Sequence, residues 1–107
     1  MKVNILGTEY TISERTAVED EYLTNCDGYC DKTTKQIVIK AENGDLGDFD
    51  VYKKKVYRHE ITHAFLYESG LSENFEHKTW GHEETMIDWI AYQFPKMIKA
   101  FEQVGCL

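Results

Sequence analysis

One five-residue motif, His59-Glu60-Ile61-Thr62-His63, constrains this chain more than any other stretch of it. On a helix, residues four apart lie one turn above each other, so His59 and His63 would share a face. Two neutral imidazoles presented in this way can bind one zinc ion. Glu60 would then lie beside the metal, where its carboxylate can take a proton from a bound water. We therefore expect a helix that supplies two metal ligands and a general base.

The residues around the motif support a helix over about 49–68. Asp48 or Asp50 can cap its first turn, and Gly70 is suited to the position just after its last turn. Apolar residues occupy two sides of this helix, which is typical of a helix packed between two layers. We expect strands on one side and a C-terminal helix on the other. One broad side carries Tyr52, Val56, His59, His63, Leu66 and Tyr67, and another carries Ile61, Ala64 and Phe65.

The N-terminal forty residues have the pattern of strands. Residues 2–6 and 9–13 alternate apolar and polar side chains across Gly7-Thr8, which predicts a β-hairpin. The β-branched run in residues 36–40 predicts a further strand. Tyr29 and Cys30 would pair with that strand across the turn at 32–35. Residues 14–25 are acidic and weakly patterned, and either a loop or a short helix fits them.

The C-terminal third predicts a second long helix from about residue 80, with Thr79 as its N-cap. Pro95 lies inside this pattern and should kink the helix or split it near 94–95. Together these elements predict a single α+β domain over residues 1–107, with an antiparallel sheet of about four strands followed by two helices. The expected buried stripe of the second helix consists of Ile87, Ile90, Ala91, Phe94, Ile98 and Phe101.

Composition excludes several classes of partner. The 107 residues carry a formal net charge of −7, whereas nucleic acids and anionic membranes attract basic surfaces. The N-terminal residues lack the apolar run of a signal peptide, and no stretch approaches membrane-spanning length. We therefore expect no nucleic-acid or membrane partner and a cytoplasmic location. In that setting the odd cysteine count fits reduced thiols, buried or half-buried, at Cys26, Cys30 and Cys106.

A catalytic zinc site normally takes three protein ligands and keeps one position open, so the motif needs a third ligand. The candidates downstream are His77, His82, Glu83, Glu84 and Asp88. Glu84 and Asp88 are four residues apart and would share a helix face. This spacing offers one metal ligand and, one turn on, a carboxylate that accepts the second ring N–H of a ligating histidine. His82 or Glu83 as the ligand remains an alternative.

The motif, a spacer of about twenty residues and a helical Glu84-x-x-x-Asp88 together resemble the gluzincin metallopeptidases, the thermolysin-like zinc proteases. Over residues 27–95 the chain looks similar to small phage and mobile-element peptidases of the ImmA/IrrE type. The resemblance implies a minimal zincin-like fold. It also implies His59, His63 and Glu84 as zinc ligands, Glu60 as general base, and Asp88 as the carboxylate that orients His59. Thermolysin-like enzymes usually have asparagine before the helical glutamate, and this chain has Glu83.

The resemblance further implies hydrolysis of a peptide bond in a protein or peptide substrate, for example a regulatory protein such as a phage repressor. Candidate donors to the developing oxyanion are Tyr67, His77, His82 and Tyr92. Residues 36–40, as an exposed edge, would accept the substrate as an added strand. The alternative is a non-catalytic, zinc-stabilised binding module of the same fold, which the small size of the chain favours. Glu60 favours the enzyme, because a purely structural site has no use for a base.

Overall fold

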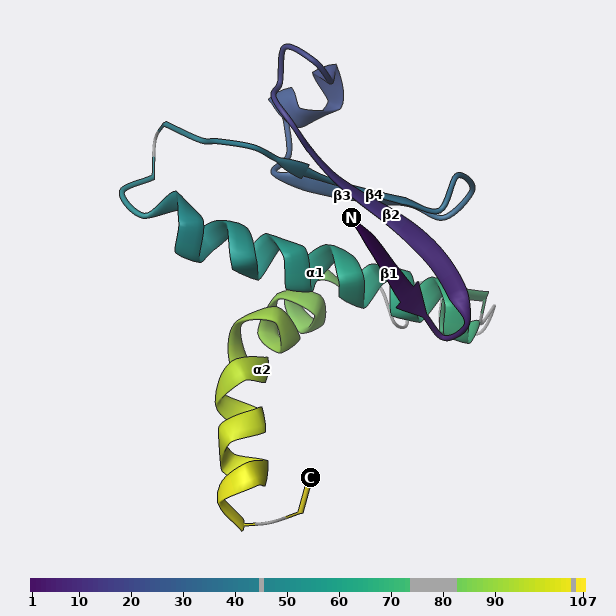
Figure 1. Ribbon diagram of the computed structural model, residues 1–107, viewed down its shortest axis with the longest axis vertical. Helices are drawn as coiled ribbons and strands as arrows, with labels where there is room; N and C mark the ends of the chain where they lie inside the picture. Colours follow the sequence, from purple (N-terminus) through teal and green to yellow (C-terminus); the bar gives the residue numbers. More distant parts are fainter. Residues whose placement is uncertain (45, 74–82, 105) are drawn as a thin grey trace.

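The computed structural model describes residues 1–44, 46–73, 83–104 and 106–107, and it has an α+β fold (Figure 1). A four-stranded sheet is followed by two long helices, and α1 lies between the sheet and the first turns of α2. The elements in chain order are β1 (Lys2–Ile5), β2 (Thr8–Arg15), the 3-10 helix η1 (Glu21–Thr24), β3 (Gly28–Asp31), β4 (Gln36–Lys40), α1 (Phe49–Ser69), the 3-10 turn η2 (Leu71–Glu73) and α2 (Glu84–Val104).

The N-terminal hairpin is confirmed, with a turn one residue earlier than expected. Strands β1 and β2 pair antiparallel, and Leu6-Gly7 forms the turn. The φ angles of Leu6 and Gly7 are +51° and +94°. A two-residue turn with two positive φ angles matches the right-handed twist of the strands, and glycine adopts such an angle without strain.

The sheet is mixed, so the expectation of a wholly antiparallel sheet is wrong. Its strand order is β1-β2-β4-β3, with β2 and β4 parallel and β3 and β4 antiparallel. The predicted pairing of Tyr29 and Cys30 with β4 is confirmed. Ile37, Val38 and Ile39 of β4 are all fully buried, as the run of apolar residues in an interior strand requires. Strand β4 is therefore not an edge, and β3 occupies the edge beside it.

The core lies between the sheet and α1. Side chains from three strands meet Val56 and Ala64 of the helix, and Tyr52, Tyr57 and Ile61 pack against the margin of this cluster. Removal of such side chains from water is the main favourable contribution to folding, at about 1.5–3 kcal/mol for a large apolar residue. The strand residues of the cluster are Ile5, Tyr10, Ile12, Ile37 and Ile39.

Helix α1 begins and ends where the sequence predicts. The carboxylate of Asp48, not that of Asp50, accepts a hydrogen bond from the backbone N–H of Val51 at 3.2 Å. This bond satisfies one of the donors that a helix leaves free in its first turn. At the other end Gly70 adopts the left-handed conformation, with φ of +83°, and stops the helix.

Helix α2 begins at Glu84 in the described residues, and the carboxylate of Glu83 caps it. That carboxylate accepts the backbone N–H groups of Thr85 at 3.1 Å and of Met86 at 3.0 Å. The predicted cap at Thr79 lies outside the described residues. The helix continues through Pro95 without being split, and its ribbon bends between the first turns beside α1 and the last turns, which run away from α1 (Figure 1).

The buried stripe of α2 is shorter than the sequence suggests. Ile87 and Ala91 are fully buried, whereas Phe94 and Phe101 are 44% and 38% exposed. Only the first half of α2 therefore packs closely against α1. Neither this helix nor α1, across the residues described, combines the length and apolar character that crossing a membrane demands.

Glu68, in the last turn of α1, joins the helix to the sheet. Its carboxylate accepts hydrogen bonds from Lys35 Nζ at 2.7 Å, Tyr10 Oη at 2.7 Å and Thr8 Oγ1 at 3.0 Å. The bonds from Lys35 and then Tyr10 lower the pKa of Glu68 to about 2. These donors come from β2 and from the turn before β4, so the carboxylate joins both segments to α1.

We expect Glu68→Gln to destabilise the fold at neutral pH and to lose that effect in acid. The carboxylate of Glu68 titrates at about 2 when folded, against an ordinary value of 4.5, so its stabilisation is complete above pH 4.5 and disappears as pH falls towards 2. Urea unfolding of both proteins between pH 2 and 7 measures the difference. Glu102→Gln, on the exposed end of α2, is the control. A difference that does not change with pH would contradict this role of Glu68.

Candidate metal centre

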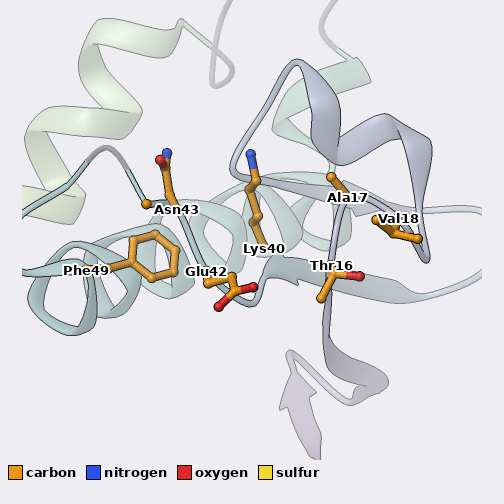
Figure 2. Close-up of a pocket in the computed structure, with 8 residues that line it drawn as sticks. Thr16, Ala17, Val18, Lys40, Glu42, Asn43 and Phe49 are labelled. Atoms are coloured by element: carbon orange, nitrogen blue, oxygen red, sulfur yellow. The ribbon is translucent and has the colours of Figure 1, made fainter.

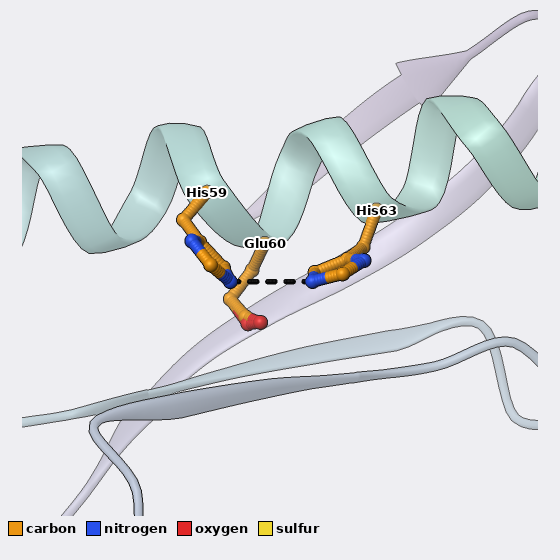
Figure 3. Close-up of side chains that lie close together, drawn as sticks. All are labelled: His59, Glu60 and His63. Carbon is orange, nitrogen blue, oxygen red and sulfur yellow. Dashed lines mark hydrogen bonds between the residues drawn. The ribbon is translucent and has the colours of Figure 1, made fainter. Parts of the chain in front are cut away.

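His59, Glu60 and His63 lie together on the side of α1 that faces the sheet (Figure 3). Each offers one potential ligand atom, and these atoms all lie within 4.8 Å of one another. Glu60 and His63 are buried, at 5% and 9% exposure, and His59 is half-buried. The predicted helical geometry of the motif is thus confirmed, and the group could hold a metal ion.

Glu84, from the first turn of α2, meets both histidines. Its Oε2 lies 3.1 Å from His59 Nε2 and its Oε1 lies 3.2 Å from His63 Nε2, while the two Nε2 atoms are 3.2 Å apart. Ligand atoms bound tetrahedrally to zinc at 2.0–2.1 Å lie about 3.3 Å from one another. The spacing of these two nitrogens and one carboxylate therefore fits a small metal ion with three protein ligands.

Asp88 orients His59 from one turn further along α2. Its Oδ1 lies 2.7 Å from His59 Nδ1 and 2.7 Å from Lys55 Nζ. Because a carboxylate accepts the proton of Nδ1, the lone pair of the neutral imidazole is on Nε2, the atom that faces Glu84 and His63. Burial acts to raise the pKa of Asp88, but the bonds from Lys55 and His59 outweigh it, and the pKa is lowered.

Glu60 has an unusual carboxylate. Its Oε2 is buried and has no hydrogen-bond partner among the described residues. Burial first, and the negative charge of Glu84 second, raise the pKa of Glu60 to about 8. A buried acceptor without a partner is costly, and it fits a position where a cation or a proton donor enters. The donor set of two imidazoles and one carboxylate, with this second carboxylate beside it, suits a divalent cation.

The centre opens into a pocket of about 340 Å³ beside the edge strand β3. Burial, followed by the charge of Glu60, raises the pKa of the Cys30 thiol to about 12. Cys26, Cys30 and Cys106 are free thiols as predicted, but Cys26 and Cys106 are exposed and not buried. The residues that line the pocket are Cys26, Gly28, Tyr29, Cys30, His59, Glu60, His63, Tyr67 and Glu84.

The other candidates from the sequence have different positions. Tyr67 lines the pocket, one helical turn beyond His63. Tyr92 instead lies with its ring centre 4.7 Å from Lys55 Nζ. Glu83 uses both carboxylate oxygens to cap α2, and so it does not take the place of Glu84 in the described structure. His77 and His82 lie outside the described residues.

Lys55 and Gly28 belong to the surroundings of the centre and were missed at the level of sequence. Lys55 is 8% exposed and bonds to Asp88, and its Nζ lies 5.5 Å from the ring centre of Tyr52 and 4.7 Å from that of Tyr92. Lys55 lies four residues before His59, and this spacing alone indicates that the two side chains share a helix face. Gly28 brings the backbone of β3 against α1, and a Cβ there would lie 3.0 Å from Val38 O, 3.0 Å from Val56 Cγ1 and 3.3 Å from Glu60 Cγ.

We expect Gly28→Ala to destabilise the protein by about 1–3 kcal/mol, as overpacking of a core usually does. The added methyl group would push β3 away from α1, because the carbonyl of Val38 is held in the sheet. Chemical denaturation gives the change in free energy of unfolding. Gly47→Ala is the matched control, since a Cβ at Gly47 meets nothing within 4 Å. Equal stability of the two variants would show that β3 is not packed this tightly.

A second hollow, of about 760 Å³, lies away from the centre near the start of α1 (Figure 2). It shares no residue with the pocket beside β3, and its charged side chains are one lysine and one glutamate. The residues that could hold a metal ion therefore lie at the smaller pocket and not at this hollow. The residues that line the hollow are Thr16, Ala17, Val18, Lys40, Glu42, Asn43, Gly44 and Phe49.

Comparison of the chain with protein-family models, with curated proteins and with solved structures found no match in any of the three.

Proposed function

We propose that this protein is a zinc-dependent peptidase of the gluzincin kind, with a minimal zincin-like fold. His59, His63 and Glu84 are the zinc ligands, Asp88 orients His59, and Glu60 is the general base. One observation carries the proposal: Nε2 of both histidines and the carboxylate of Glu84 converge within 3.2 Å of one another, next to a buried glutamate oxygen without a partner. Purely structural zinc sites have no need for that glutamate.

When bound, a zinc ion supplies Lewis-acid polarisation of the scissile carbonyl and makes water more acidic. Glu60 takes a proton from the attacking water and later passes it to the leaving amine. The burial of Glu60 suits a carboxylate that holds a proton between these two transfers, because bulk water has little access to it. Of the two candidate donors that the structure describes, Tyr67 and not Tyr92 lines this pocket, so Tyr67 is the one placed to stabilise the developing oxyanion.

The substrate lies as an extended peptide along β3. This strand is the edge of the sheet, and its residues Gly28, Tyr29 and Cys30 line the pocket beside Glu60. A peptide that adds to an edge strand gains backbone hydrogen bonds without any requirement for a particular sequence. From the sequence we expected residues 36–40 to accept the substrate as an added strand. Because these residues form an interior strand, the proposal gives that role to residues 28–31. The resemblance to ImmA/IrrE-type enzymes suggests a regulatory protein, such as a phage repressor, as the substrate class.

The direct test combines metal analysis with proteolysis. The full chain is stripped with a chelator, reloaded with zinc, and incubated with a mixture of unfolded proteins whose new N-termini are identified by mass spectrometry. We expect one zinc ion per chain and cleavage only after reloading. A protein that binds no zinc, or cleavage that persists in the chelator, would overturn the proposal. One bound zinc without cleavage of any substrate would instead support a zinc-stabilised binding module.

A further inference from the structure

Pro95 leaves a buried backbone carbonyl of α2 without its normal donor. Proline has no N–H, so the carbonyl oxygen of Ala91, four residues earlier, receives no helical hydrogen bond from position 95. The proline ring also crowds that carbonyl and tilts it outward from the helix. Ala91 is fully buried against α1. A buried carbonyl in this position needs another donor.

Arg58 of α1 supplies that donor. Its Nε donates to the carbonyl oxygen of Ala91 at 2.5 Å. The guanidinium is always charged, and a charged donor makes a stronger hydrogen bond than a neutral one. Arg58 directly precedes His59, so this bond joins the backbone of α2 to the residue next to a proposed zinc ligand.

The bond also continues a row of contacts between the two helices. Along α2, Glu84 contacts both histidines, Asp88 bonds to His59 and Lys55, and Ala91 receives Arg58. Spacings of four and three residues place these positions on one face of α2. The contacts of Glu84 and Asp88 end on flexible side chains, whereas Arg58 holds the backbone itself. That backbone contact limits sliding and rotation of α2 along α1.

We propose that Arg58 and Pro95 act as a positioning pair for the metal centre. Pro95 keeps the carbonyl of Ala91 turned towards α1, and Arg58 binds it and so sets the position of α2 along α1. Glu84 and Asp88 are then already in position to contact His59 and His63 before a metal ion binds. This inference rests on the proposed metal centre, and it assigns no contact with substrate or metal to Arg58.

A double-mutant cycle tests the pair through metal affinity. Arg58→Met keeps the apolar stem and removes the donor, and Pro95→Ala restores a helical N–H to the carbonyl of Ala91. The full-length variants are titrated with Co²⁺, whose visible spectrum reports its ligands, and Zn²⁺ is measured by competition. We expect Arg58→Met to weaken Co²⁺ binding about tenfold or more, as loss of residues that orient ligands does. In the Pro95→Ala background, Arg58→Met should have little further effect.

Controls separate this role from a general effect on folding. Lys54→Met removes an exposed cation from α1 and should leave Co²⁺ affinity unchanged. Circular dichroism and urea unfolding report stability independently of the metal. Unchanged Co²⁺ affinity in Arg58→Met, or simply additive effects of the two substitutions, would overturn the positioning pair. If Arg58→Met does not fold, Pro95→Ala decides, because wild-type Co²⁺ affinity in that variant would also overturn it. If the wild type itself binds no Co²⁺ or Zn²⁺, the metal centre fails and the pair fails with it.

Discussion

Replacement of Glu60 by glutamine is expected to slow peptide hydrolysis by about 10²–10⁴-fold and to leave zinc bound. Glutamine has nearly the same shape but cannot take a proton from water. The fold should tolerate the change, because burial already disfavours the charged form of Glu60 and raises its pKa to about 8. The measurements are the rate of cleavage per zinc-loaded chain, the zinc content and the free energy of unfolding.

The comparison for this variant is Glu102→Gln, which removes an exposed carboxylate far along α2 and should cleave like the wild type. If Glu60→Gln cleaves as fast as the wild type while it retains zinc, Glu60 is not the base. Loss of both zinc and activity would point instead to a role for Glu60 in holding the metal. Its atoms belong to the same close group as those of His59 and His63, so zinc content must be measured in every case.

Removal of a proposed ligand is expected to abolish tight zinc binding. His63→Ala and Glu84→Ala each delete one of three converging groups, and each should cost more affinity than Asp88→Asn. For Asp88→Asn we expect a loss of about 10–100-fold, the usual effect of removing the partner that orients a ligating histidine. Competition titration against a chromogenic chelator gives the three affinities.

Stability supplies a second measurement of the same ligands. Zinc at 100 times its dissociation constant stabilises the folded wild type by about 2.7 kcal/mol, and a variant that no longer binds zinc gains nothing. Unfolding with and without added zinc therefore separates ligand loss from misfolding. If Glu84→Ala keeps wild-type affinity and the zinc-dependent gain, Glu84 is not a ligand. The third ligand would then have to come from elsewhere, with His77 and His82 the next variants to make.

Several elements of this protein could be predicted from short-range patterns in its sequence. Helix α1, which carries the motif His59-Glu60-Ile61-Thr62-His63 (HEITH), follows from apolar spacing, from the capping residue Asp48 and from Gly70, all of which act within one or two turns. The hairpin and strand β4 follow from alternation and from β-branched residues in the same way. The pairing of Glu84 with Asp88 on one face needed only helix geometry. These features depend on neighbours in the chain, so they could be predicted without the fold.

Other features depend on contacts between distant segments. The parallel pairing of β2 with β4 places β3 at the edge, and no local pattern distinguishes this order from a simple antiparallel one. Burial of Lys55 follows from the position of α2, whose approach brings Asp88 and Tyr92 to it. The exposure of Phe94 and Phe101 has the same origin, because α2 packs on α1 only in its first half.

The HEITH motif shows where the two kinds of information meet. The sequence by itself determined that His59 and His63 share a helix face with Glu60 beside them, because the rise and twist of a helix place residues four apart together. Only the tertiary structure decided that Glu84 meets both histidines, that Asp88 holds His59, and that Arg58 reaches the carbonyl left by Pro95. These contacts join residues 21 to 33 positions apart in the chain, and the distance between such residues is set by how α2 packs on α1, not by any repeat along the backbone.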